Sequence, residues 1–147
     1  MKIIFLDIDG VLNTDDNWGK REPKEASTPH CIAALNKITN ATGAKIVVSS
    51  AWRIDRTVQQ LKDILAEMGV IGEVIGKTPS LDGQRVTEIK AWISMNLGDW
   101  PESFITIDDE WIGDSDEFQA IHIKPYYREG LTEAQADQAI TLLGGEN

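Results

Sequence analysis

The chain has 147 residues, which suits one domain with a buried core and is too short for two domains of ordinary size. A hydrophobic content of 41% and a charged content of 26% are typical of a soluble globular protein. The formal net charge of −10 argues against broad electrostatic binding to nucleic acid or to an anionic membrane, although it permits a small basic patch.

Cysteine usage and hydropathy indicate the cellular compartment in which the protein is expected. The single cysteine, Cys31, excludes an internal disulfide and fits a reducing compartment. No signal peptide is recognisable, and no apolar run approaches the roughly 18–20 residues of a membrane span. We therefore expect a single cytoplasmic domain over residues 1–147 with no membrane partner.

The first predicted element is a buried strand over Lys2–Leu6, an apolar run that leads directly into Asp7, Asp9 and Gly10. Alternate side chains of a strand point to opposite faces, so Asp7 and Asp9 can point into one site. Two converging carboxylates are costly unless a cation or a proton-transfer task compensates them. This arrangement suits divalent-metal chemistry on a phosphate, with one Asp free to act as the nucleophile.

The polar stretch over residues 13–27 is predicted to be a long loop or flap, and loops of this length are often functional. Capping signals and apolar periodicity predict the elements that follow. The expected helices run from Thr28 to about Thr42, from Thr57 to Met68, over Arg85–Leu97 and from Thr132 to Leu143, and the expected strands are Lys45–Val48, Glu73–Ile75, Ser103–Ile107 and Ala120–Ile123, with a loop over Gly76–Gln84.

Strands that alternate with helices predict an α/β fold, a three-layer Rossmann-like parallel sheet with helices on both faces. In open sheets of this kind, ligands bind beyond the carboxyl ends of the strands. Three predicted strand ends supply polar groups at that edge: the Asp7/Asp9 pair, Ser49, and the Asp108/Asp109 pair. We expect these side chains to converge on one site.

Four short motifs follow one another along the chain: Asp7-Ile8-Asp9-Gly10-Val11, Val47-Val48-Ser49, a basic residue that opens a late helix, and Ile107-Asp108-Asp109. In this order they resemble the four motifs of the haloacid dehalogenase-like (HAD) superfamily of phosphotransferases. Segments 42–53, 85–92 and 130–132 are similar to a small branch of that superfamily, which includes HAD domains attached to bacterial RNA-repair proteins. The resemblance covers nearly the whole chain.

The resemblance implies a role for each residue of the first two motifs. Asp7 stands where the family has the nucleophile that attacks phosphorus and forms an aspartyl-phosphate. Asp9 stands at the position of the acid/base, and both residues would contribute to a Mg²⁺ site, Asp9 through its backbone carbonyl. Ser49 would donate to a phosphoryl oxygen, with the Ser50 amide as a further donor.

The last two motifs would supply the rest of the metal site and a basic side chain. The resemblance implies that Asp108, Asp109 or both complete the Mg²⁺ shell. Arg85 stands about where the family has a cation that balances charge around the nucleophile, and Lys77 and Lys90 are alternatives. A carboxylate and a phosphate dianion repel each other, so such a site needs cations, and a cluster of oxygen ligands suits Mg²⁺.

Three further residues are candidates for substrate contact. Arg53 could clamp a substrate phosphate and Trp52 could stack on a base. The alternative is that the two residues pack locally, with an ion bridge from Arg53 to an acidic residue. Trp18 in the flap could close over substrate or pack on the domain.

The sequence leaves no room for a cap domain, because segment 13–27 allows only a flap and segment 50–84 is filled by core elements. A capless site stays open, which favours a bulky phosphorylated substrate such as a nucleic-acid end or a protein. A homodimer could cover the site in place of a cap, so both a monomer and a homodimer are compatible with the sequence.

The leading hypothesis is a Mg²⁺-dependent phosphomonoesterase that acts through an aspartyl-phosphate intermediate. The RNA-repair branch points to nucleic-acid 3′-phosphate ends, whereas the net charge of −10 points the other way. A nucleotide or sugar phosphatase is the alternative within the same class. The alternative of another class is a non-catalytic phospho-accepting or interaction module, although Ser49 stands where a receiver-like domain would have its Asp.

Overall fold

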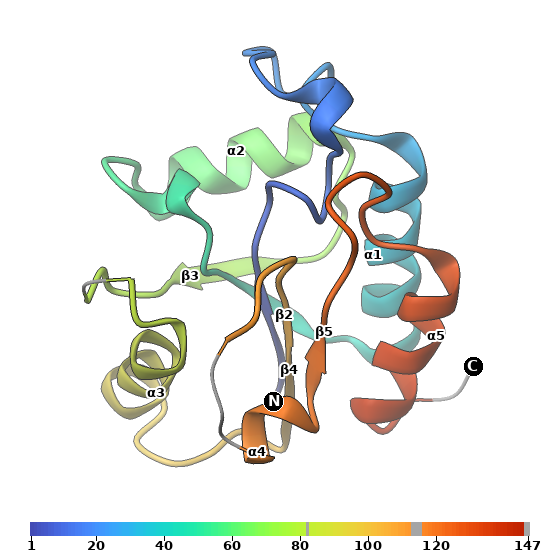
Figure 1. Ribbon diagram of the computed structural model, residues 1–147. Coiled ribbons are helices and arrows are strands. Elements are labelled where there is room, and N and C mark those ends of the chain that lie inside the picture. Colours follow the sequence, from blue (N-terminus) through green and yellow to red (C-terminus); the bar gives the residue numbers. More distant parts are fainter. Residues whose placement is uncertain (82, 113–115, 146–147) are drawn as a thin grey trace.

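The computed structural model describes residues 1–81, 83–112 and 116–145. Its centre is an all-parallel, five-stranded sheet in the order β3-β2-β1-β4-β5 (Figure 1). The strands are β1 (Lys2–Leu6), β2 (Lys45–Val48), β3 (Val74–Lys77), β4 (Ser103–Ile107) and β5 (His122–Ile123).

Helices connect the strands, and local sequence signals account for several of their ends. Thr57 begins one helix with a capping box, since its side chain accepts from the Gln60 amide while the Gln60 side chain accepts from the Thr57 amide. None of the helices in the described ranges combines the length and the apolar character that crossing a membrane would require. The α-helices are α1 (Pro29–Thr42), α2 (Val58–Met68), α3 (Arg85–Asn96), α4 (Asp116–Gln119) and α5 (Glu133–Leu142).

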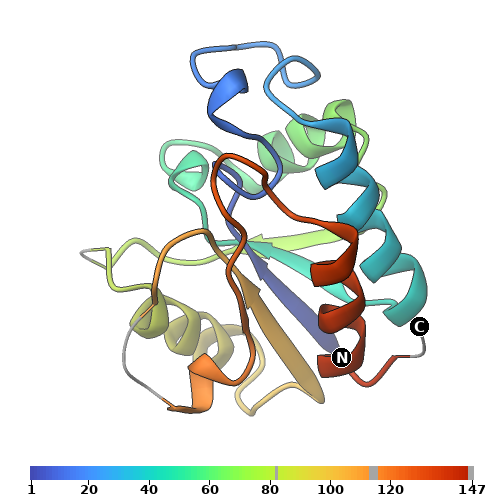
Figure 2. The ribbon, with the colours of Figure 1, turned by 45° about the vertical axis from the view of Figure 1, so that its right-hand side comes forward.

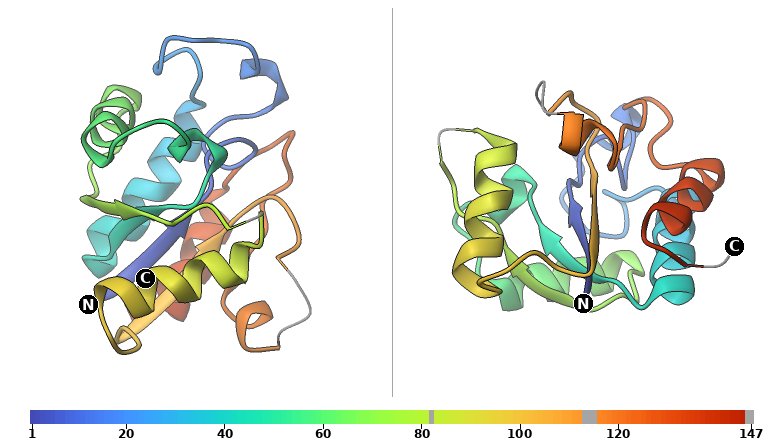
Figure 3. Two further views of the ribbon diagram at one scale, coloured as in Figure 1. Left: turned by 90° about the vertical axis from the view of Figure 1, so that its left-hand side faces the viewer. Right: turned by 90° about the horizontal axis from the view of Figure 1, so that it is seen from below.

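The predicted three-layer α/β architecture is confirmed, with helices on both faces of the sheet (Figure 3). On one face, Ile4 and Leu6 of β1 belong to the core cluster shared with α1, α2 and α5. On the other face, Phe5 packs edge to face against Trp92 of α3, with 5.8 Å between the ring centroids. Adjacent residues of β1 thus pack into the cores on opposite faces of the sheet. This explains why apolar residues do not alternate with polar ones along the strand.

The topology places an open crevice beside β1, which lies in the middle of the sheet between β2 and β4. The chain leaves β1 over one face to reach β2 and later returns over the other face to reach β4. The strand order therefore reverses next to β1, and open α/β sheets bind ligands at such a switch point. Ladder bonds continue past the strand ends, since the Asp7 amide donates to the Ile107 carbonyl (2.9 Å) and the Ser49 amide to the Leu6 carbonyl (2.9 Å).

Some predicted element bounds were wrong. β3 runs to Lys77 rather than ending at Ile75, because its ladder with β2 continues to the Val48–Lys77 pair. The expected loop over Gly76–Gln84 therefore begins two residues later, and its residue 82 lies outside the described residues. β5 is two residues shorter than expected, and α4 and the 3₁₀-helices η1 (Asp15–Asn17) and η2 (Ala51–Arg53) were not predicted.

The flap over residues 13–27 is organised around one side chain, that of Asn17. Its amide oxygen accepts from the Thr14 amide (3.1 Å) and the Thr28 hydroxyl (2.6 Å), and its nitrogen donates to the Glu25 carbonyl (3.0 Å). Trp18 stacks on Tyr127, with 5.7 Å between the centroids, so the flap is tied to the loop between β5 and α5 (Figure 2).

We predict that Asn17→Ala loosens the flap without unfolding the core. Losing several side-chain hydrogen bonds costs roughly 1–2 kcal/mol of local stability, which corresponds to about tenfold faster local opening. Limited trypsin digestion measures this rate, because Lys20, Arg21 and Lys24 lie in the flap. Asn40→Ala, on the exposed side of α1, is the matched control, and equal cleavage of the two variants would contradict the assignment.

Candidate active site

Three carboxylates gather at the carboxyl ends of β1 and β4. Oxygen atoms of Asp7, Asp108 and Asp109 lie within 4.8 Å of one another, and Asp7 and Asp108 are buried. Their positions follow from the sheet, because Asp7 and Asp108 come directly after paired strands whose last residues, Leu6 and Ile107, are in register. Two of the predicted motifs therefore converge as expected.

The loop after β1 passes very close to this cluster at Gly10. This residue has a φ of 79°, and a Cβ atom there would overlap the carboxyl group of Asp109. The Gly10 amide donates to the Asn13 side-chain oxygen (2.9 Å), which holds the turn in place. Only glycine allows this backbone conformation and this close approach together.

Among the described residues, Arg85 in the first turn of α3 is the cation that forms ion pairs with the carboxylates of the cluster. Its Nε lies 3.3 Å from Asp108 Oδ2, and its Nη2 lies 4.0 Å from Asp7 Oδ1. The side chain is about one quarter exposed, so it can face both the buried acids and an incoming ligand.

The two alternative basic residues point elsewhere. Lys77 Nζ donates to the Arg56 carbonyl at 2.6 Å, and Lys90 Nζ lies 5.7 Å from the ring centroid of Phe118. Of the three basic residues considered from the sequence, Arg85 is therefore the one that the structure brings to the carboxylates.

Arg53 lies inside the protein, which corrects the expectation that it clamps a substrate phosphate. Its Nη2 donates to Glu88 Oε2 (2.9 Å), and its remaining N–H groups donate to backbone carbonyls. The side chain is 5% exposed, so no donor is left for a ligand. The alternative of an ion bridge to an acidic residue is confirmed. The carbonyl partners belong to Ser49, Ser50, Thr78 and Pro79.

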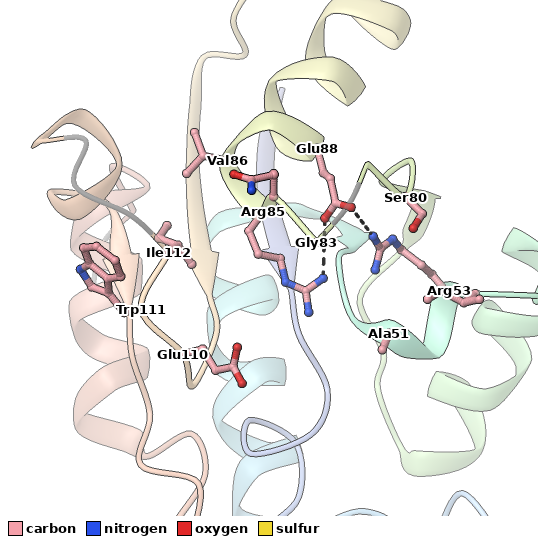
Figure 4. Close-up of a pocket in the computed structure, with 12 residues that line it drawn as sticks. Ala51, Arg53, Ser80, Gly83, Arg85, Val86, Glu88, Glu110, Trp111 and Ile112 are labelled. Atoms are coloured by element: carbon pink, nitrogen blue, oxygen red, sulfur yellow. Dashed lines mark hydrogen bonds and ion pairs between the residues drawn. The ribbon is translucent and has the colours of Figure 1, made fainter.

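Glu88 joins Arg53 and Arg85 into one network (Figure 4). It is fully buried, and its Oε2 also accepts from the Leu81 amide at 2.7 Å. Its Oε1 has no hydrogen-bond partner among the described residues and lies 4.0 Å from Arg85 Nη1. Glu88 was missed from the sequence, and the available signal was an acid three residues after Arg85 beside an apolar position, Ile89.

Ser49 and Ser50 occupy the end of β2, next to β1. Both are buried, and the Ser49 amide bond to Leu6 brings Ser49 to the same edge of the sheet as Asp7. The Ser50 hydroxyl accepts from the Trp52 amide (3.2 Å) and thereby caps η2. The Ser50 oxygen accepts in this contact, so either hydroxyl can still donate to a ligand.

Asp9 is exposed and is not one of the three carboxylates that lie within 4.8 Å of one another, and both of its oxygens are already bonded. Oδ1 accepts from Asn13 Nδ2 (3.0 Å), and Oδ2 accepts from Trp52 Nε1 (3.0 Å). Trp52 lies near the site as expected, and its N–H group orients Asp9. Contact of its ring with a base stays a prediction. Asn13 was missed from the sequence because it lies within a polar loop that has several such residues.

Charge is poorly compensated in the cluster. Burial raises the pKa of Asp7 to about 8, and repulsion from Asp108 and a hydrogen bond with Asp109 act in the same direction. Arg85 lowers the pKa of Asp7 but does not outweigh burial. Burial also raises the pKa of Asp109. A proton or a metal ion must supply the missing positive charge, and these oxygen ligands fit a hard divalent cation.

An open pocket of about 510 Å³ lies beside Arg85 (Figure 4). Glu110 and Trp111, which follow β4, line it together with Arg85 and Ser80. The carboxylate of Glu110 and the cation of Arg85 both face this space, so it is of mixed charge.

We predict that the metal-free protein loses stability as the pH rises. The folded-state pKa of Asp7, about 8, exceeds its ordinary value of 3.8, so the folded state holds this proton more tightly than the unfolded state. The unfolding free energy therefore falls between about pH 4 and pH 8 and levels off above that range. Thermal melts should show a lower Tm at about pH 8 than at about pH 5, by about 3 °C for each kcal/mol lost.

Asp7→Asn should flatten this pH dependence and raise the Tm at about pH 8, because it removes the buried charge. A divalent metal should also raise the Tm of the unsubstituted protein at that pH and have little effect on the variant. A steeper loss of stability toward acid pH in the unsubstituted protein than in Asp7→Asn would contradict this account.

Comparisons with known proteins agree with the assembled motifs. The family model described as the HAD domain in Swiss Army Knife RNA repair proteins matches residues 3–136. No curated protein and no solved structure matches the chain. The match spans most of the sequence and includes all the acidic residues gathered at the sheet edge. The resemblance is thus confirmed, and the chain belongs to this family of HAD domains, whose general activity is that of phosphatase-type hydrolases.

Proposed function

We propose that this protein is a Mg²⁺-dependent phosphomonoesterase that acts through an aspartyl-phosphate on nucleic-acid 3′-phosphate ends. The observation that carries the proposal is the packing of Asp7, Asp108 and Asp109 against a single arginine at the switch point of the sheet. Family membership supports the class of reaction. The identity of the metal, the covalent intermediate and the nature of the substrate go beyond that class and are part of the proposal.

The carboxylates of Asp7, Asp108 and Asp109 would hold the metal. They offer oxygen ligands only, which Mg²⁺ prefers, and burial together with repulsion from Asp108 raises the pKa of Asp7 and of Asp109. When bound, Mg²⁺ supplies charge neutralisation between the substrate phosphate and these acids. Arg85 supplies part of the same neutralisation from the other side.

In the first half-reaction, a deprotonated Asp7 oxygen attacks phosphorus and forms the P–O bond of an aspartyl-phosphate. The bond between phosphorus and the leaving oxygen breaks, and Asp9 gives its proton to that oxygen. Asn13 and Trp52 hold the Asp9 carboxyl group in place through both of its oxygens. The Ser49 hydroxyl and Arg85 stabilise the charge on the phosphoryl oxygens.

In the second half-reaction, Asp9 takes a proton from water as the water oxygen attacks phosphorus. The P–O bond to Asp7 breaks, and inorganic phosphate and free Asp7 are formed. The same carboxyl group thus serves first as acid and then as base, which leaves the enzyme in its starting protonation state.

The substrate assignment rests on the openness of the site. The insertion after β1 forms a flap of residues 13–27, and Trp18 in this flap stacks on Tyr127 and lines the small pocket that includes Asp9. A site without a cap accepts a phosphate carried on a long chain. The description of the matching family, which concerns RNA repair, supports nucleic acid as that chain.

We predict that Asp7→Asn abolishes phosphate release from a 3′-phosphorylated oligonucleotide, because the amide cannot form the covalent intermediate. Phosphate release with and without Mg²⁺ measures this. Asp63→Asn, on the exposed side of α2, is the matched control and should retain full turnover. Turnover by Asp7→Asn above the level of a protein-free blank would exclude the covalent mechanism.

Asp9→Asn should lower kcat about 10²–10⁴-fold, the usual contribution of a general acid or base. Both half-reactions should slow, because both use this group. Rapid-quench measurement of the aspartyl-phosphate separates the two rates. If only one rate changes, the assignment of both roles to Asp9 is wrong.

A further inference from the structure

A second pocket of about 510 Å³ lies between the flap and α2, and we call it the flap groove. Three of its seven lining residues are cations and none of those seven is an acid, although the whole chain carries a net charge of −10. Positive charge concentrated in this way attracts polyanions locally. The lining residues are Lys20, Arg21, Pro23, Ala51, Trp52, Arg56 and Ile64.

The flap groove connects directly with the proposed acid/base. Lys20 and Trp52 line both the flap groove and a smaller pocket of about 190 Å³ that includes Asp9. Trp52 forms part of the wall between them, with its N–H group 3.0 Å from Asp9 Oδ2. A ligand in the groove therefore reaches the side of the site where Asp9 stands.

Hydrogen bonds hold the chain at two of the cations of the groove, Arg56 and Lys20. The Arg56 guanidinium lies 5.7 Å from the centre of the Trp52 ring and donates to the Trp52 carbonyl at 3.0 Å. The Arg56 carbonyl accepts from Lys77 Nζ at 2.6 Å, which fixes the chain at that point. On the opposite wall, the Lys20 amide donates to the Asn17 carbonyl at 3.1 Å.

The role proposed for Asp9 tells which part of the substrate occupies this space. A general acid must stand next to the oxygen that leaves, so the leaving group lies on the Asp9 side of the reacting phosphate. In an end phosphatase the leaving group is the nucleic-acid chain itself. The flap groove opens from that side, whereas the pocket beside Arg85 lies next to the phosphate-balancing cation.

We infer that the flap groove binds the single-stranded nucleic-acid segment that carries the reacting phosphate, with Lys20, Arg21 and Arg56 on its backbone phosphates and Trp52 against a base. This inference rests on the proposed function and names the site that recognises the substrate chain. Cations that line a groove together with a partly exposed aromatic ring are typical of single-strand binding. An acidic peptide would use the cations and leave the ring without a role.

The test measures binding separately from turnover. In the Asp7→Asn background, fluorescence anisotropy compares a single-stranded 3′-phosphorylated oligonucleotide with a phosphorylated acidic peptide, over a range of salt concentrations. The groove variant carries Lys20→Gln, Arg21→Gln and Arg56→Gln. The matched control carries Lys62→Gln, Lys90→Gln and Lys124→Gln, which removes the same charge from exposed positions outside the groove.

The groove variant should bind the oligonucleotide at least about tenfold more weakly than the control. The slope of log binding constant against log salt concentration should become shallower by about 2, because each of the three lost ion pairs to a single strand contributes about 0.7. In the Asp7-containing protein, the ratio of kcat/KM for the oligonucleotide to that for a nucleoside 3′-monophosphate should fall by a similar factor in the groove variant.

Equal oligonucleotide binding by the groove and control variants would overturn the inference, as would tighter binding of the acidic peptide through the same three cations. Failure of the proposed function gives a different result: the parent protein would release no phosphate, whereas the groove-dependent oligonucleotide binding would persist.

Discussion

The crowding of carboxylates at one point of the sheet is the constraint on which the rest of the site depends. Backbone ladder bonds between β1 and β4 place Asp7 and Asp108 side by side regardless of their charge. Burial removes the water that would screen them, and the pKa of Asp7 rises to about 8 as a result. The apolar cores on both faces of β1 stabilise this unfavourable arrangement, and a bound cation would relieve it.

The cation that the chain itself provides is held by a buried network. Arg85 lies between the acids and Glu88, and Glu88 in turn bonds Arg53. Arg53 donates to the carbonyls of Ser49 and Ser50, so the network links α3 to the end of β2. A buried charge that loses its partner is strongly destabilised, so these residues depend on one another for position. Glu88 therefore lies between the two arginines, bonded to Arg53 at 2.9 Å and 4.0 Å from Arg85.

The architecture and the acidic cluster were predictable from the sequence, because strand periodicity, capping boxes and motif order are local signals. The partners of the motif residues were not. Arg53 and Glu88 are 35 positions apart, and Trp52 and Asp9 are 43 apart, so only the folded chain brings them together. The end of β3 was misjudged at Gly76, whose missing side chain leaves room for Trp92 rather than marking a turn. The role of Arg53 was predicted wrongly because the sequence does not distinguish an exposed arginine that can bind phosphate from a buried one that bonds only to the protein.

The net charge of −10 and a basic groove are compatible because the two act over different distances. At physiological ionic strength the Debye length is about 8 Å, so exposed acids far from the groove contribute little to its local potential. Cations within a few ångströms of a bound strand dominate instead. The acidic remainder of the surface would repel nucleic acid elsewhere on the molecule, which would reduce non-specific binding and leave the contacts proposed for a strand concentrated beside Asp9. An acidic composition thus limits where a polyanion can bind rather than whether it can.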